Sequence, residues 1–187
     1  NVPYLQISTK KKTGRKFIPV NGIPVNIYFK DTLQNNLLGK VITDAEGLAR
    51  IGFPPSFRSS WDSLNEFKFV ATSDLPAGQE PLSADITIKK AILVIDTTSA
   101  DGVRTVTGEL KEKSGNTWVP VKSIDMKLSI KRMDGNLSVG DQDTYTSDST
   151  GVASAEFKRD SIPGDLKGNI TLVAKVEDND TYGNLAT

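Results

Sequence analysis

The chain has 187 residues, with 23 Lys and Arg against 23 Asp and Glu, and a net charge of zero at pH 7. A balanced charge argues against nucleic acid as the main partner. The absence of Cys and His excludes disulfides, most transition-metal sites and the usual nucleophile–base pairs of enzymes. The longest purely apolar run, residues 91–95, is too short to span a membrane.

An internal repeat begins near the start of the chain. Residues 12–20 (KTGRKFIPV) match residues 113–121 (KSGNTWVPV) at an offset of about 101 residues. After each copy, apolar and mainly polar residues alternate, over 23–29 and again over 124–130, which predicts a half-buried strand. Phe17 and Trp118 occupy equivalent positions, so we expect both to be core or strand-edge packing residues.

A second repeated block contains turn residues. Asp44 and Gly47 correspond to Asp148 and Gly151. Asp can accept hydrogen bonds from the backbone just downstream, and Gly supplies a positive φ, so this spacing predicts a hairpin turn in each copy. A third repeated block sets Phe67, Phe69 and Ala71 against Ile170, Leu172 and Ala174. No segment has the pattern of an amphipathic helix, and the best candidate is a single turn near residues 60–66.

The junction between the copies is short. Residues 84–90 are predicted to form the last strand of the first copy and residues 91–98 the first strand of the second. We therefore predict an all-β chain of two tandem Ig-like Greek-key β-sandwich domains, 1–90 and 91–187, with about seven strands each. So short a junction predicts limited hinge freedom.

The repeated pattern resembles bacterial Ig-like domains and carboxypeptidase regulatory-like modules of exported proteins. It consists of a Gly, then Pro-Val, an alternating strand, and Thr/Ser-Asp-x-x-Gly-x-Ala; in the first copy these are Gly14, Pro19-Val20, 23–29 and 43–49. The second copy also looks like modules of Bacteroidetes-type bacteria. This resemblance implies spacers, stalks and adhesive arms outside the cytoplasm, and it implies no particular ligand.

Acidic residues are the first candidates for a catalytic or metal-binding site. Most of them occur in turn-like contexts and form no recognisable catalytic motif, so we expect no enzyme. Oxygen ligands in loops suit calcium, and two clusters supply candidates, Asp141 with Asp143 and Asp178 with Asp180. Neither cluster has the distal bidentate Glu of a calcium loop, and solvated turns are the favoured interpretation of both. No cofactor is expected, with calcium as the alternative.

Aromatic and basic side chains suggest two further surfaces. Phe57 and Trp61, in a segment joining two strands, could stack on sugar rings, or Trp61 could cap the end of its own sandwich. Residues 10–12, with Arg15 and Lys16, form a basic hairpin tip. It could contact an anionic surface, or its lysines could protect a strand edge from pairing.

A triplet of Asp, Ser or Thr, and an aliphatic residue or Thr resembles the O-glycan acceptor of Bacteroidetes exported proteins. Its hydroxyl residues here are Thr32, Ser63, Thr97, Ser149 and Ser161. An attached sugar would be bulky and solubilising. Turn-rich β proteins place Asp beside Ser or Thr in any case.

Together these patterns predict a non-enzymatic extracytoplasmic spacer or protein-interaction module, in the periplasm or at the cell surface. The alternatives are a carbohydrate-binding or adhesive module and a calcium-stiffened surface array. The chain begins at Asn1 with no signal peptide, so we expect an excised segment of a larger exported or membrane-anchored protein. Its partners would be other domains of that protein, a separate protein, or glycans.

Overall fold

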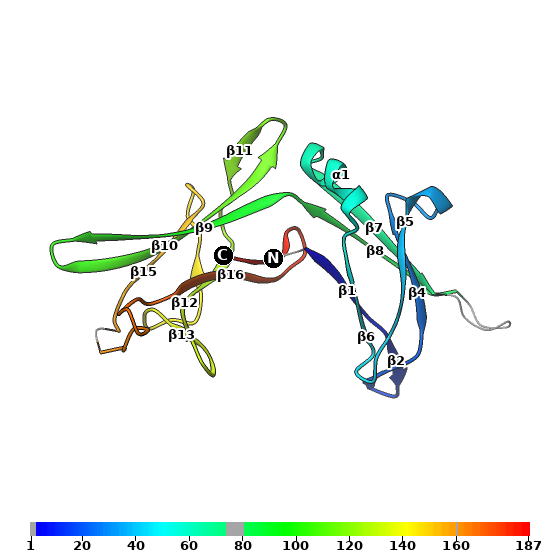
Figure 1. The fold of residues 1–187 in the computed structure, drawn as a ribbon, viewed down its shortest axis with the longest axis horizontal. Helices are drawn as coiled ribbons and strands as arrows, with labels where there is room; N and C mark the ends of the chain where they lie inside the picture. Colours follow the sequence, from blue (N-terminus) through cyan, green and yellow to red (C-terminus); the bar gives the residue numbers. More distant parts are fainter. Residues whose placement is uncertain (1–2, 74–80, 160) are drawn as a thin grey trace. The chain divides into compact units, whose positions relative to one another are not determined.

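The computed structural model describes residues 3–73, 81–159 and 161–187, and it divides into two compact units, 1–88 and 89–187 (Figure 1). The described residues are mainly antiparallel strands, which confirms the all-β prediction. The best candidate for a helical turn overlaps a short helix, α1 (Arg58–Ser63), which is preceded by a 3₁₀ turn at Pro55–Phe57. No helix among the described residues is long and apolar enough to cross a membrane.

Unit 1 is built from three antiparallel sheets. Its strands are β1 (Tyr4–Ser8), β2 (Lys10–Thr13), β3 (Lys16–Pro19), β4 (Pro24–Phe29), β5 (Leu37–Ile42), β6 (Leu48–Gly52), β7 (Glu66–Ser73) and β8 (Ser83–Lys89). Strand β1 pairs with β6, and β2 pairs with β3 as a hairpin. The remaining sheet has the order β5-β4-β7-β8.

Unit 2 has two larger sheets. Its strands are β9 (Ala91–Ala100), β10 (Val103–Ser114), β11 (Thr117–Pro120), β12 (Asp125–Arg132), β13 (Gly135–Ser138), β14 (Tyr145–Thr146), β15 (Val152–Glu156), β16 (Leu172–Asn179) and β17 (Gly183–Ala186). Strand β10 pairs with β9, β11 and β15, and the second sheet has the order β13-β12-β16-β17, with β14 also on β12.

Strand pairs that both units contain have the same register. The pair Lys12↔Phe17 of the β2–β3 hairpin corresponds to Lys113↔Trp118 of β10–β11. In the same way Leu5↔Ile51 of β1–β6 corresponds to Val106↔Ala155 of β10–β15. The long strand β10 is therefore the counterpart of β1 and β2 together.

Each unit buries apolar residues between facing sheets. In unit 2, Val106 of β10 and Leu128 of β12 are fully buried in one cluster with Ala174 of β16. In unit 1, the core is aromatic, with Phe67 fully buried and Phe29 packed edge-on against Phe57 at 4.8 Å between ring centroids. Alternation along the strands places these side chains on the inner faces, as the sequence pattern predicts.

The turn at Asp44 and Gly47 has the predicted hydrogen bonds but a different role. Asp44 Oδ1 accepts from the N–H groups of Glu46 and Leu48, and Gly47 has a φ of 70°. The flanking strands β5 and β6 belong to different sheets, so the hairpin prediction is wrong. The same holds at Asp148, between β14 and β15. The turn carries the chain from one sheet to the other.

Phe17 and Trp118 are strand-edge residues and not core residues. Among the described strands, Phe17 is 66% exposed on β3, which pairs with β2 alone, and Trp118 is 38% exposed on β11, which pairs with β10 alone. Their equivalence reflects the shared hairpin position at the edge of a sheet.

Candidate interaction site

The acidic side chains of the two units are mostly held by local partners. The hydroxyl and N–H of Thr150 and the N–H of Val152 bind Asp148 Oδ1 at 2.6, 2.8 and 3.1 Å, and these bonds hold the pKa of Asp148 below its usual value. The N–H groups of Asn169 and Lys167 do the same for the pKa of Asp165. A carboxylate stabilised in its charged form is a structural acceptor and a poor general acid.

The calcium candidates are exposed and separately engaged. Asp141 accepts from Lys158 Nζ at 2.6 Å, which lowers the pKa of Asp141. Asp178 lies near the end of β16, at a shift of register, with a φ of 51°, and its N–H donates to Asn184 Oδ1. Asp143 and Asp180 are exposed. Within residues 3–73, 81–159 and 161–187, no group of three or more acidic side chains is placed to hold a metal ion.

The two aromatic candidates belong to the unit 1 core. Phe57 is only 5% exposed, so its ring is not available to a sugar. Trp61, on α1, is half-buried and stacks on Phe67 with 4.6 Å between ring centroids. This is the sandwich-capping position that the sequence offered as the alternative, and only the outer face of the indole remains for a ligand.

The glycan-acceptor candidates all lie on the surface. Each of the five hydroxyl residues is exposed: Thr32, Ser63, Thr97, Ser149 and Ser161. Ser63 lies at the end of α1 and donates to Ser59 O at 2.8 Å, whereas Thr97 is within β9. The Asp before Ser161, residue 160, lies outside the described residues.

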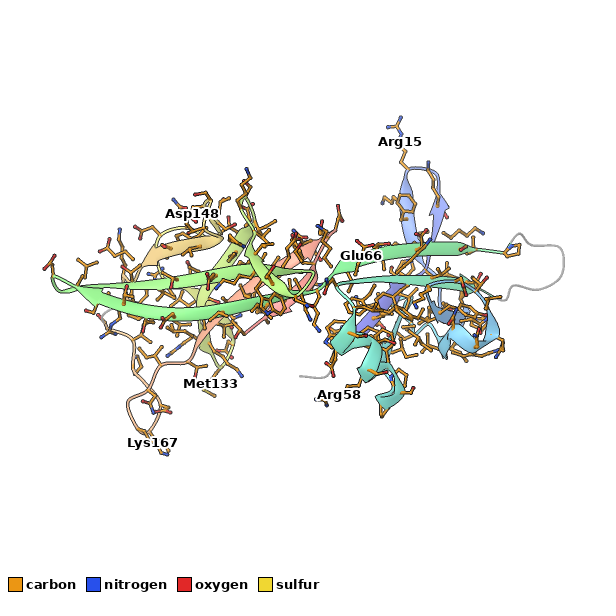
Figure 2. The ribbon with its side chains drawn as sticks, turned by 90° about the horizontal axis from the view of Figure 1, so that it is seen from above. Arg15, Arg58, Glu66, Met133, Asp148 and Lys167 are labelled. Carbon is orange, nitrogen blue, oxygen red and sulfur yellow. The ribbon has the colours of Figure 1, made fainter. Side chains whose placement is uncertain are left out.

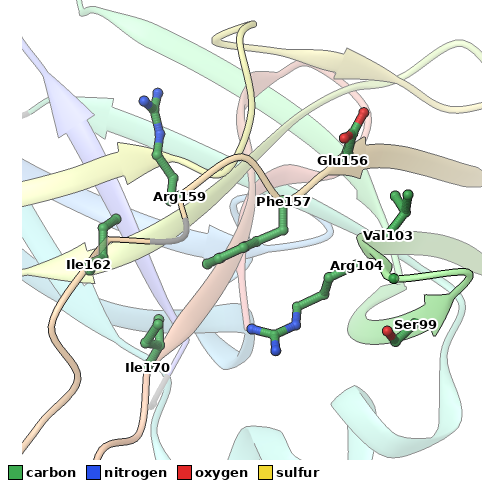
Figure 3. A pocket seen from close by; sticks show the side chains of 9 residues that line it. Ser99, Val103, Arg104, Glu156, Phe157, Arg159, Ile162 and Ile170 are labelled. Carbon is green, nitrogen blue, oxygen red and sulfur yellow. The ribbon is translucent and has the colours of Figure 1, made fainter.

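A cleft of about 310 Å³ lies at one end of unit 2 (Figure 3). Two arginines line it, and both have structural partners. Arg159 donates to the carbonyl oxygens of Ser138 and Gly140, each at 3.1 Å, and the Arg104 guanidinium lies 5.5 Å from the centroid of the Phe157 ring. Arg159 is thereby engaged in holding the backbone beside the cleft.

Sequence reasoning missed a polar cluster at the start of unit 2. Tyr182 is 8% exposed and donates its hydroxyl to Glu112 Oε2 at 2.7 Å, and Lys89 Nζ lies 3.1 Å from the same oxygen. The hydrogen bond from Tyr182 is the main cause that lowers the pKa of Glu112, with Lys89 contributing further. The Lys89 N–H also donates to Thr181 O at 2.8 Å, so the first residue of unit 2 is fixed to its last hairpin.

Sheet edges are the remaining candidate surface. Among the described residues, β1 pairs with β6 alone, whereas its counterpart β10 has partners on both edges. Beside this edge is the predicted basic hairpin, in which Lys10, Lys11 and Lys12 on β2 are all exposed. Arg15 extends outward from its tip (Figure 2). The basic strand β2 therefore follows directly on β1 and lies beside its outer edge.

No protein-family model and no curated protein sequence matches this chain. Among solved structures, the chain is similar to a tetra-tandem repeat in the extending region of a large adhesion protein, at 14% identity and a TM-score of 0.36. It is also similar to the apo structure of Bacteroides uniformis β-glucuronidase 3, at 15% identity and a TM-score of 0.31.

These two similarities cover most of the present chain, 91% and 88%, but only 42% and 20% of the solved chains. The chain therefore spans less than half the length of either. At these TM-scores, neither solved protein bears on the function of this one.

Proposed function

We propose that this chain is a non-enzymatic structural spacer and protein-interaction module within a larger exported or membrane-anchored bacterial protein. The observation that carries the proposal is the junction between the repeated units. Strand β8 ends at Lys89 and β9 begins at Ala91, so Lys90 is the single residue between two strands. A linker this short cannot behave as a flexible coil, which suits a module that holds its neighbours at a set distance.

The ends of this junction support the same proposal. Lys90 O accepts from the N–H of Lys113 at 2.8 Å, and Lys89 is bound through both its N–H and its side chain. Residues that could serve as a hinge are thereby tied to the body of unit 2. Hinges need a few residues free to change φ and ψ, and these bonds restrict that freedom.

The electrostatics of the acidic residues also favour a non-enzymatic role. Among the described Asp and Glu residues, every resolved pKa shift is downward, at Asp31, Glu112, Asp141, Asp148, Asp165 and Glu177. Acid–base catalysis by carboxylates needs one pKa raised towards neutrality. Here hydrogen bonds and lysines instead stabilise the charged forms.

The test is a distance distribution between the units. Because the chain has no Cys, Arg15→Cys and Asn116→Cys place one spin label at the tip of each equivalent hairpin. We expect a narrow distribution by pulsed electron paramagnetic resonance. The matched control inserts Gly-Ser-Gly-Ser after Lys90 and should broaden it. An uninserted chain as broad as the control would refute a spacer role.

A further inference from the structure

The β2–β3 hairpin of unit 1 carries a concentrated positive charge. All of its residues, 10–19, are exposed. The hairpin is a separate two-stranded sheet that projects from the rest of unit 1 (Figure 2). It contains no acidic residue, and its cations are Lys10, Lys11, Lys12, Arg15 and Lys16. Unit 2 has only two lysines and one glutamate at the corresponding positions, so the charge belongs to this hairpin and not to the fold.

These cations have no carboxylate partners among the described residues. Every ion pair found there lies elsewhere in the chain. An acidic turn with Asp44 and Glu46 meets the base of the hairpin, where the Thr9 N–H donates to Gly47 O. Asp44 is engaged within that turn by the N–H groups of Glu46 and Leu48. The described part of the chain therefore leaves the charge of the hairpin available to an external partner.

An exposed aromatic ring accompanies this charge. Phe17 is 66% exposed and lies opposite Lys12 in the hairpin register. In unit 2, where β9 covers the neighbouring edge of β10, the tip residues 114–118 are exposed as well. The openness of the tip is therefore a property of the hairpin itself. Protection of a strand edge by lysines explains residues 10–12, but it explains neither Arg15 nor the exposed ring.

The strand register distributes the cations around the hairpin. Paired residues share a face of a two-stranded sheet, and successive residues alternate between its faces. Lys12 and Phe17 therefore lie on one face, and Lys11 and Lys16 lie on the other. Arg15 extends from the tip between them (Figure 2). A peptide or a linear polyanion would bind along one face, whereas a planar anionic surface that meets the tip contacts both faces at once.

A bilayer with anionic lipids matches this combination. Its headgroup phosphates attract Lys and Arg side chains, and its interface accepts an aromatic ring beside them. We propose that the β2–β3 hairpin docks by its tip on an anionic phospholipid bilayer, with Lys12, Arg15 and Lys16 against the headgroups and Phe17 at the acyl boundary. This role goes beyond the spacer role and is independent of it, because the distance measurement is made without lipid.

Sedimentation with vesicles tests the proposal on the whole chain. The chain should bind vesicles of phosphatidylglycerol and phosphatidylcholine, fail to bind phosphatidylcholine alone, and dissociate at high salt. Arg15→Gln and Lys16→Gln should each weaken binding about fivefold, the size expected of one cation at an anionic surface. Phe17→Ala should weaken it about three- to tenfold, because the ring loses part of its contact with water on docking. The matched controls in unit 2, Lys113→Gln and Trp118→Ala, should leave binding unchanged.

A fluorophore sensitive to polarity identifies the hairpin that meets the lipid. Thr13→Cys and Ser114→Cys place it at matched positions in the two hairpins, and the chain has no other Cys. On mixed vesicles the emission from Thr13→Cys should shift to the blue, and that from Ser114→Cys should not. Circular dichroism of each variant distinguishes weakened binding from unfolding.

Two results would overturn the proposal outright. One is the absence of binding to the mixed vesicles, and the other is an equal loss of binding in the variants of the two hairpins. Tighter binding to soluble dextran sulfate that Phe17→Ala leaves unchanged would also overturn it, because an anionic polymer would then be the partner.

Discussion

Tyr182 and Glu112, 70 residues apart in the chain, are joined by a 2.7 Å hydrogen bond from the Tyr182 hydroxyl to Glu112 Oε2. Burial, and then the neighbouring carboxylate, raise the pKa of the Tyr182 hydroxyl, which therefore stays a donor at all ordinary pH values. Glu112 in turn holds Lys89, the residue at which the chain enters this unit. The bond thus links the last hairpin of unit 2 to its first residue.

Tyr182→Phe should destabilise unit 2 by about 1.5–3 kcal/mol, the usual range for a hydrogen bond to a charged group. Chemical denaturation followed by unit 2 NMR signals measures this change. Glu112→Gln, which keeps an acceptor but loses the charge, should cost less. A Tyr182→Phe chain as stable as the unmodified one would show that the bond contributes nothing.

The same pair predicts a pH dependence. The pKa of Glu112 is lower in the folded chain than its ordinary value, so its stabilising contribution is complete above the unfolded pKa. It is lost as the pH falls through the folded pKa. Acidification from neutral pH should therefore reduce the free energy of unfolding less in Tyr182→Phe than in the unmodified chain, measured by urea titrations at several pH values. Parallel pH profiles would contradict this linkage.

The sheet-crossing turns depend on a close approach that only glycine permits. A Cβ on Gly47 would lie 2.6 Å from Thr9 O, and φ there is 70°. Gly47→Ala should cost more than the roughly 1–3 kcal/mol of a strained φ alone. Gly14→Ala is the matched control, since Gly14 has a similar φ of 62° and open space around it. Equal losses of stability in thermal melts would exclude the steric contribution.

Substitutions in the aromatic core of unit 1 distinguish a packing role of Phe57 and Trp61 from a role in sugar binding. Phe57→Ala should cost about 3–5 kcal/mol, because the ring is buried among other aromatic rings. Trp61→Ala should cost less, because the indole is only half-buried. We expect no glycan-array binding by the unmodified chain or by Trp61→Ala. Binding that only the unmodified chain shows would favour the carbohydrate alternative.

Chelation tests the calcium alternative. Asp141 is already paired with Lys158, and Asp178 belongs to the irregular end of β16, so we expect EDTA to leave the melting temperature unchanged. Differential scanning calorimetry with and without added calcium measures this. A lower melting temperature in EDTA, lost when Asp178 and Asp180 are replaced by Asn, would instead assign calcium to that cluster.

The alternating pattern was sufficient to predict the all-β class and the strands over 23–29 and 124–130, because alternation is a local signal. It could not distinguish a hairpin from a sheet crossing at Asp44, since both turns use the same Asp and Gly chemistry. Nor could it predict the bond of Tyr182 to Glu112, which depends on two strands that meet only after folding. Phe17 illustrates a further limit, because equivalence between copies indicates a shared position and does not distinguish a core residue from the strand-edge residue that it is.

Residue-resolved hydrogen exchange tests the central claim most directly, that the chain contains two copies of one fold, in which β1 and β10 pair alike with β6 and β15, and that within residues 3–73, 81–159 and 161–187 only β10 also has a partner, β9, on its other edge. The amides of Thr105, Thr107 and Glu109 face β9, and those of Tyr4, Gln6 and Ser8 are their counterparts on β1. We predict strong protection of the first set and rapid exchange of the second, with Leu5 and Ile7 protected by β6. Equal protection of the two sets would contradict the account.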